Sequence, residues 1–170
     1  LVEVFGGKPP YRIPYEWVLL GAKAMKTHRG VAFTFSEWLK VAPPEIYRYL
    51  LLREEPRKHI SFHPERIPQL IDEFERLEAI RFGVEKPSNP VEENLALNIY
   101  PLCFPGKPPE SLPTRLPYRF AIILSQLKPL LGEDEVKGKV LKVLEKLGGR
   151  KPSKREVEEA FRRLEMASYW

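Results

Sequence analysis

The sequence predicts a mainly α-helical protein, and three observations support that fold class. Apolar residues recur at helical spacing in several segments of the 170-residue chain. Two of these segments begin with a Ser/Thr-x-x-Glu pattern, which is typical of a capped helix start. Most of the 18 prolines lie between the periodic segments, where they end one element and open the next. We therefore expect helices joined by proline-containing connections.

The first helical pair is predicted within residues 34–53. Thr34 and Glu37 have the spacing of a capping box, in which the Thr34 hydroxyl accepts from the Glu37 amide and the Glu37 carboxylate accepts in return. A helix therefore begins at this point. The Pro43-Pro44 pair ends it, and a second helix is expected over residues 45–53.

Six further elements and one loop are expected after this pair. They are a strand at 59–63, helices at 64–80, 89–101, 118–131, 133–147 and 153–170, and a proline-rich loop at 104–113. Residues 118–131 are strongly apolar, so we expect them to form the buried centre of a helical bundle. Gly148 and Gly149 end the penultimate helix. Ser153 and Glu156 form a second capping box that opens the last helix.

The helical spacing also predicts which side chains are buried. The set is Trp38, Val41, Ile46, Leu50, Phe74, Leu77, Ile123 and Leu127. Trp17 and Trp38 are candidates for stacking on a base, but burial is the favoured interpretation for both. Four neighbouring carboxylates imitate a catalytic pair, yet they fall on the polar face of a helix, and we expect them to be solvated. They are Asp72, Glu73, Glu75 and Glu78.

The composition is that of a folded protein with a substantial core. The chain is 43% hydrophobic and 30% charged, and its length corresponds to one large or two small domains. No apolar run approaches the roughly 20 residues of a membrane span, so no membrane partner is expected. Cys103 is the only cysteine, which excludes an internal disulfide and a cysteine-rich zinc site. A reducing, cytoplasmic location is expected.

Residues 23–30 form a candidate phosphate-binding loop. Lys23, Lys26 and Arg29 lie close together in it. Gly21 and Gly30 flank these cations and give the backbone freedom to move. Lysine supplies a compact charge and arginine a rigid fork of donors, so both neutralise a polyphosphate during nucleotidyl transfer. The alternative is a solvated basic turn.

A second basic cluster follows the first helical pair and is a candidate for contacts with RNA phosphates. It consists of Arg48, Arg53, Arg57, Lys58 and His59. The net charge of +5 permits nucleic-acid binding. The cations of residues 137–155 alternate with carboxylates and are interpreted as a solvated helix face. His59, His63 and Glu65 have some features of a metal site, but no further ligand is apparent, and we expect no metal ligand set.

Ordered blocks along the chain match a known family. They are Pro14-Tyr15-Glu16-Trp17, Glu37-Trp38-Leu39, Val41-Ala42-Pro43-Pro44-Glu45 and Arg48-Tyr49-Leu50, with weaker likeness at 72–78, 117–120 and 162–165. In these blocks the sequence resembles the archaeal-type class I lysyl-tRNA synthetase family, from the end of its nucleotide-binding domain onward. The resemblance covers essentially the whole chain.

In that family, residues 23–30 correspond to the second class I signature, ideally Lys-Met-Ser-Lys-Ser and in this branch closer to Lys-Met-Ser-Ser-Ser-Lys-Gly. Ala24 stands in place of the first lysine, Met25 is retained, and residues 26–28 replace three serines. Arg29 stands in place of the last lysine, and Gly30 is retained. The motif is therefore degenerate, with Lys23 or Lys26 available to substitute for the lost charge.

The resemblance implies specific roles for the residues of both basic regions. Catalytic stabilisation of the leaving pyrophosphate is assigned to Lys26 and Arg29, and nucleotide contacts to Lys23, Met25 and Gly30. Contacts with RNA are assigned to Arg48, Arg53, Arg57 and Lys58.

The resemblance also implies an organisation for the chain. Residues 1–52 correspond to the C-terminal end of a class I nucleotide-binding domain, a remnant of a Rossmann-type catalytic domain. Residues 53–170 correspond to a small stem-contact segment, ending at about residue 63, and a helical tRNA-binding bundle.

The function implied is the tRNA-binding and ATP-loop portion of a class I lysyl-tRNA synthetase. In the intact enzyme, ATP, lysine and tRNA are the partners, and lysine is attached to tRNA through lysyl-adenylate. One alternative is a non-catalytic RNA- or ribosome-binding module derived from such an enzyme. Another is a helical interaction domain with no role in RNA binding.

We predict that this chain alone does not catalyse lysine-dependent exchange of pyrophosphate into ATP. The first class I signature has the form His-x-Gly-His, and the three histidines, His28, His59 and His63, do not form it. The chain is thus expected to be a fragment or a truncated relative that lacks most of the adenylation site. Incorporation of labelled pyrophosphate above a no-protein control would contradict this prediction.

Overall fold

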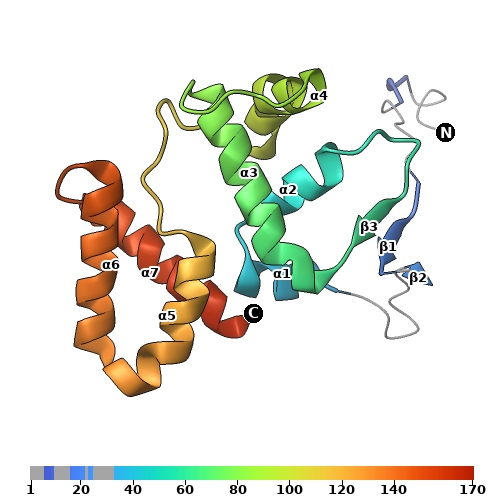
Figure 1. The fold of residues 1–170 in the computed structure, drawn as a ribbon. Helices are drawn as coiled ribbons and strands as arrows, with labels where there is room; N and C mark the ends of the chain where they lie inside the picture. The colour runs from blue at the N-terminus through green and yellow to red at the C-terminus, as the bar shows by residue number, and fades with distance from the viewer. Residues whose placement is uncertain (1–5, 10–15, 22, 25–32) are drawn as a thin grey trace.

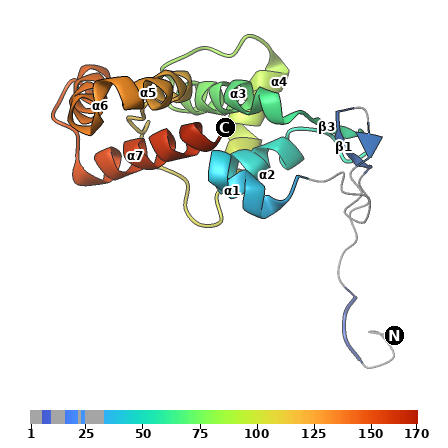
Figure 2. The ribbon, with the colours of Figure 1, turned by 90° about the horizontal axis from the view of Figure 1, so that it is seen from below.

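Helices form most of the computed structural model, which describes residues 6–9, 16–21, 23–24 and 33–170 (Figure 1). The prediction of a mainly α-helical protein is confirmed. The elements are β1 Val18–Leu20, β2 Lys23–Ala24, α1 Phe35–Val41, α2 Pro44–Leu52, β3 Ile60–Phe62, the 3-10 helix η3 Pro64–Arg66, α3 Ile67–Arg81, α4 Pro90–Asn94, the π-helix η4 Leu95–Ile99, the 3-10 helix η5 Tyr100–Cys103, α5 Tyr118–Leu131, α6 Glu133–Gly148 and α7 Lys154–Tyr169. Figure 2 shows the sheet and the α5–α7 bundle at opposite ends, with α1–α4 between them.

Both predicted capping boxes are present. The Thr34 hydroxyl accepts from the Glu37 amide at 3.2 Å, and the Glu37 carboxylate accepts from the Thr34 amide at 2.6 Å. Ser153 and Glu156 form the same pair of bonds at the start of α7. The break at Pro43 is also confirmed, because its extended backbone separates α1 from α2.

The small sheet has the strand order β2-β1-β3. β1 pairs antiparallel with β2 and parallel with β3, with Val18 opposite Ile60. Gly21 adopts a φ of +61° at the end of β1, and its N–H donates to the Phe62 carbonyl at 2.8 Å. Because β1 precedes residue 52 and β3 follows it, the sheet joins segments 1–52 and 53–170. The assignment of these segments to separate domains stays a prediction.

One hydrophobic core connects the sheet, the central helices and the bundle. Six predicted core residues are confirmed as buried: Trp38, Val41, Ile46, Leu50, Phe74 and Leu77. The Trp38 indole N–H donates to the Pro43 carbonyl at 3.1 Å, which satisfies its polar atom inside the core. The Tyr118 hydroxyl donates to the Val41 carbonyl at 2.5 Å and so joins α5 to the end of α1.

The prediction that α5 is the buried centre of the bundle is wrong for half of the helix. Ile123 and Leu127 are 52% and 37% exposed, and Leu130 is 83% exposed. Ala121 and Leu124 are buried because they lie on the face that packs against α6 and α7. The exposed residues lie on another side of α5, and strong apolar character alone did not distinguish the two sides. Within the described ranges, no helix is long and apolar enough to cross a bilayer.

The helix predicted at 89–101 is present only in its first turn as a regular α-helix. Asn89 caps α4 by accepting from the Glu92 amide at 2.9 Å. The chain then continues as the π-helix η4 and the 3-10 helix η5. Pro101 has no amide proton, so a continuous α-helical hydrogen-bond pattern cannot pass through it. The following residues 104–113 form a loop without helix or strand, as predicted.

We predict that Leu50→Ala lowers the free energy of unfolding by about 2–5 kcal/mol, because Leu50 is 3% exposed and its truncation leaves a cavity. Ile123→Ala, on the exposed side of α5, should change it by less than about 1 kcal/mol. Urea unfolding followed by circular dichroism measures both values. Equal destabilisation by the two substitutions would contradict the burial pattern.

Candidate nucleic-acid interface

The sheet holds both ends of the segment that contains the candidate phosphate-binding loop. At its start, Lys23 of β2 pairs with Leu20 of β1. At its end, the Phe33 ring packs against the rings of Phe62 and Trp38, at centroid distances of 5.2 and 6.4 Å. The chain therefore leaves the sheet after β2 and returns to it at Phe62. The described residues on the two sides of the loop therefore contact β1 and β3 of the same sheet.

The loop residues themselves lie outside the described part of the chain. This applies to Lys26 and Arg29, predicted as catalytic, and to Met25 and Gly30, predicted as nucleotide contacts. Lys23 is placed in β2, next to β1. The chemical roles of all five residues stay predictions.

Arg53 lies at the C-terminal end of α2 and is partly engaged by its neighbours. Its Nη1 donates to the Glu73 carboxylate at 2.6 Å, and its guanidinium lies 5.8 Å from the centre of the Tyr49 ring. The Arg53 side chain is 26% exposed. Its Nε is buried and has no hydrogen-bond partner in the described structure. The same Nε lies 3.8 Å from the Glu54 carboxylate, so the Arg53 guanidinium is shared between Glu54 and Glu73.

A cavity of about 260 Å³ lies beside β3 and brings several predicted residues together. Arg53 and Lys58 both line it, together with His59 and His63. Arg66 lines it as well, although sequence reasoning misses this residue because it appears only as a polar position near a helix start. The cavity thus combines cations from α2, from the turn before β3 and from η3.

The other two predicted RNA contacts lie apart from this cavity. Arg57 is exposed in the turn between α2 and β3 but does not line the cavity. Arg48 lies five residues before Arg53, which is about 140° around the helix. The charge of Arg48 opposes the effect of burial on Cys103, whose pKa burial raises to about 12. Arg48 therefore lies near Cys103, on a different side of α2 from Arg53.

The predicted burial of Trp17 is wrong, whereas that of Trp38 is confirmed. Trp17 is 60% exposed and Trp38 is 1% exposed. The reason is the alternation of side chains along a strand. Val18 packs against the core, so the preceding residue Trp17 is placed on the outer face of the sheet.

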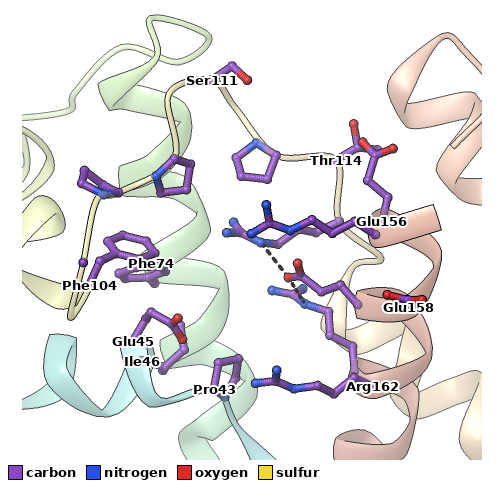
Figure 3. Close-up of a pocket in the computed structure, with 18 of the residues that line it drawn as sticks. Pro43, Glu45, Ile46, Phe74, Phe104, Ser111, Thr114, Glu156, Glu158 and Arg162 are labelled. Atoms are coloured by element: carbon purple, nitrogen blue, oxygen red, sulfur yellow. Dashed lines mark hydrogen bonds and ion pairs between the residues drawn. The ribbon is translucent and has the colours of Figure 1, made fainter. Parts of the chain in front are cut away.

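A larger groove of about 1030 Å³ lies between α7 and the proline-rich loop at 104–113 (Figure 3). Phe74 and Phe104 line one wall, and Arg162 and Glu158 project from α7 on the other. Its charges are mixed: the cations include Lys107, Arg155 and Arg162, and the carboxylates include Glu45, Glu110 and Glu158. The groove therefore shows no preference for an anionic ligand.

A buried ion pair lies at the base of this groove and corrects the prediction that Glu78 is solvated. Glu78 is 2% exposed, and its carboxylate accepts hydrogen bonds from Arg115 and from the Tyr100 hydroxyl. Arg115 also donates from Nε to Glu159 of α7 at 3.2 Å. Burial lowers the pKa of Arg115, and the nearby charge of Arg163 lowers it further. These partners offset the cost of removing the charges from water.

The other carboxylates of α3 are also engaged by cations rather than only by solvent. Glu75 lies 2.5 Å from Nη1 of Arg163, which is buried and also donates to the Leu116 carbonyl. Asp72 accepts from Arg119 at 2.5 Å. The polar face of α3 is therefore the surface that docks on the bundle. This correction supports a structural rather than a catalytic role for these carboxylates.

The two histidines of the described residues, His59 and His63, each lie near a carboxylate. Nδ1 of His63 lies 3.2 Å from the Glu65 carboxylate, and its Nε2 lies 3.4 Å from the Ser61 hydroxyl. His59 Nδ1 lies 3.8 Å from the Glu16 carboxylate. Among the residues that the structure describes, no three His, Cys, Asp or Glu side chains are grouped as metal ligands.

Comparison with known families accounts for the motifs at the sheet and at the first helical pair. Residues 1–103, more than half of the chain, match the family model described as tRNA synthetases class I (K). This chain belongs to the class I tRNA synthetase family of that description. The resemblance seen in the sequence blocks is confirmed.

The similar curated proteins are named lysine–tRNA ligase. The relative from Methanocaldococcus jannaschii is 43% identical over 130 residues, which cover 74% of this chain and 24% of the relative. The relative from Methanosarcina barkeri is 47% identical over 88 residues, covering 51% of this chain and 16% of the relative. The relative from Methanopyrus kandleri is 33% identical over 135 residues, covering 79% and 23%. This chain spans about a quarter of the length of the curated relatives it matches.

We predict that Glu78→Ala lowers the free energy of unfolding by about 3–5 kcal/mol, because it leaves Arg115 buried without its main partner. Glu158→Ala, on the exposed side of α7, should change it by no more than about 0.5 kcal/mol. Urea unfolding measures both. A loss below about 1 kcal/mol for Glu78→Ala would contradict the role given to the ion pair.

Proposed function

We propose that this chain is the tRNA-binding and ATP-loop portion of a class I lysyl-tRNA synthetase. The observation that carries the proposal is that residues 23–30 fall within the matched family region, and that the described residues on either side of them contact the sheet whose strand β3 lines the cavity with Arg53 and Lys58. The loop that handles ATP and the surface that meets RNA would thus be joined through one sheet. ATP and tRNA are both anions, which suits the cations at this place.

In this proposal, the candidate phosphate-binding loop at residues 23–30 contacts the phosphates of ATP. Lys26 and Arg29 stabilise the charge that develops on the leaving pyrophosphate, as charged donors do in phosphoryl and nucleotidyl transfer. Lys23, Met25 and Gly30 contact the nucleotide.

The RNA-binding surface in this proposal consists of Arg48, Arg53, Arg57 and Lys58. Arg57 and Lys58 are exposed and need no rearrangement to reach a phosphate. Arg53 already pairs with Glu73, so a phosphate would have to share its guanidinium. The Arg53 side chain is 26% exposed, so a phosphate can approach it from solvent.

The intact enzyme would activate lysine with ATP to form lysyl-adenylate and pyrophosphate. The lysyl group would then pass to the terminal adenosine of tRNA. Within this scheme, residues 1–52 belong to the nucleotide-binding domain, and residues 53–170 form the stem-contact segment and the tRNA-binding bundle. We place the protein in the cytoplasm, where protein synthesis uses the aminoacylated tRNA.

The second candidate function is a non-catalytic RNA- or ribosome-binding module derived from a synthetase. The observation that favours it is Ala24, which stands where the family signature has its first lysine. Loss of that charge weakens stabilisation of the leaving group. The two functions share the RNA-binding surface and differ only in the use of the loop.

We predict that binding to tRNA weakens with rising salt and that the triple variant Arg53→Ala, Arg57→Ala, Lys58→Ala shows a flatter dependence. Each lost phosphate contact should reduce the slope of log affinity against log salt by up to about 0.9 on a duplex. Filter binding or fluorescence anisotropy at several salt concentrations measures the slope.

The matched control for this experiment removes three exposed lysines of α6: Lys137→Ala, Lys142→Ala, Lys146→Ala. It makes the same change in net charge at the opposite end of the molecule. The slope should keep its wild-type value in the control, because the α6 lysines alternate with carboxylates and are interpreted as a solvated face of the bundle that does not contact RNA. An unchanged slope in the first variant, or an equal reduction in both, would refute the proposed contact surface.

A further inference from the structure

Trp17 lies on the outer face of the sheet, near the turn before β3 that carries Arg57 and Lys58. Trp17 and His59 precede the paired residues Val18 and Ile60, and the Ile60 amide donates to the Trp17 carbonyl at 3.1 Å. In parallel strands, residues in register lie on the same face. Trp17 and His59 are therefore neighbours on the outer face, and both are exposed.

The cavity beside β3 is next to this outer face, because His59 and Ser61 are among the residues that line it. β3 is the edge strand of the sheet, with β1 on one side and the cavity on the other. His59 belongs to both, because it neighbours Trp17 and also lines the cavity. His59 therefore connects the face that carries Trp17 to the cavity that Arg53 and Arg66 line.

The donors of the cavity suit a single phosphate group. Arg53 and Arg66 both line the cavity; the Arg53 side chain is 26% exposed, and Arg66 is exposed. Glu73 and Glu54 also line the cavity, at 2.6 and 3.8 Å from Arg53. The two carboxylates reduce the net attraction for an anion, so a bound phosphate would share Arg53 with Glu73 and would contact Arg66 directly.

We propose that Trp17 and this cavity bind one unpaired RNA nucleotide, with its base stacked on the indole and its phosphate held by Arg53 and Arg66. Every base has a π-face that can stack on an exposed indole, but only when the base is free of a duplex. The shared chemistry is a base with an attached phosphate, which RNA or a free nucleotide supplies. The inference rests on the proposed RNA-binding function and adds Trp17 and Arg66 to it.

Binding of an oligoadenylate of about ten nucleotides by the full chain tests this inference. Trp17→Ala should weaken binding by about 5- to 100-fold, the range expected from the loss of one base-stacking contact. Trp17→Phe keeps a ring and should stay within about threefold of wild type. Tyr169→Ala is the matched control, because Tyr169 is an aromatic residue of similar exposure, 63%, at the end of α7 and outside the sheet. Urea unfolding of each variant verifies that it is folded.

Two ligand comparisons identify the source of the nucleotide. A blunt duplex of the same length should bind Trp17→Ala and wild type equally, because its bases are already stacked. AMP should bind far more weakly than the oligomer, and inorganic phosphate should not distinguish Trp17→Ala from wild type. AMP binding as tight as that of the oligomer would overturn the assignment to RNA.

The phosphate part is tested separately with Arg66→Ala. On single-stranded RNA, this substitution should reduce the salt slope by about 0.7. This inference alone would be refuted if Trp17→Ala left the affinity for the oligomer unchanged while the triple variant of Arg53, Arg57 and Lys58 still flattened the salt dependence of tRNA binding. No salt-dependent tRNA binding, with Trp17 still required for the oligomer, would refute the proposed function instead.

Discussion

The buried ion pair between Glu78 and Arg115 is the constraint on which the relative placement of the helices depends. Glu78 lies on α3, Arg115 lies in the segment before α5, and Glu159 extends the contact to α7. Charges removed from water are stable only when their partners meet them in good geometry. Any rotation of α3 against α7 that separates them leaves a charge buried and unpaired. The pair therefore selects one alignment of the bundle against the central helices.

This alignment also positions the surface that the proposed function uses. Arg53 is held by Glu73 of α3, so the end of α2 and the cavity beside β3 follow the placement of α3. Phe62 of β3 then contacts Phe33, where the chain returns from the signature loop. A continuous set of packed residues thus connects the bundle to the loop.

Features set by local sequence were predictable, and those set by distant packing were not. The capping boxes at Thr34 and Ser153 and the break at Pro43 involve residues within a few positions of one another, and all are present. The exposure of Ile123 depends on which side of α5 meets α6 and α7. Periodicity identifies an apolar side, but it does not show whether a partner covers it.

The same distinction applies to the candidate site. The cations Arg57 and Lys58 are adjacent in the sequence and are therefore predicted together. The cavity is also lined by Arg66 from η3, which the sequence does not indicate. Glu78 has the spacing of a solvated carboxylate, and only the approach of Arg115 explains its burial. Trp17 has the character of a core residue, and the parallel pairing of β1 with β3 places it outside. Each error concerns a contact between residues far apart in the chain.

The hydrogen bond from Tyr118 to the Val41 carbonyl has a consequence for synthesis of the protein on the ribosome. The two residues are 77 positions apart, so roughly 4–15 s of translation separate their emergence. During that interval the end of α1 lacks its partner from α5, and the helix α7 that packs on α1 is still to be made. The nascent chain therefore exposes apolar surface of α1 until the bundle arrives. A chaperone that binds such surface would meet this protein mainly before its last three helices are synthesised.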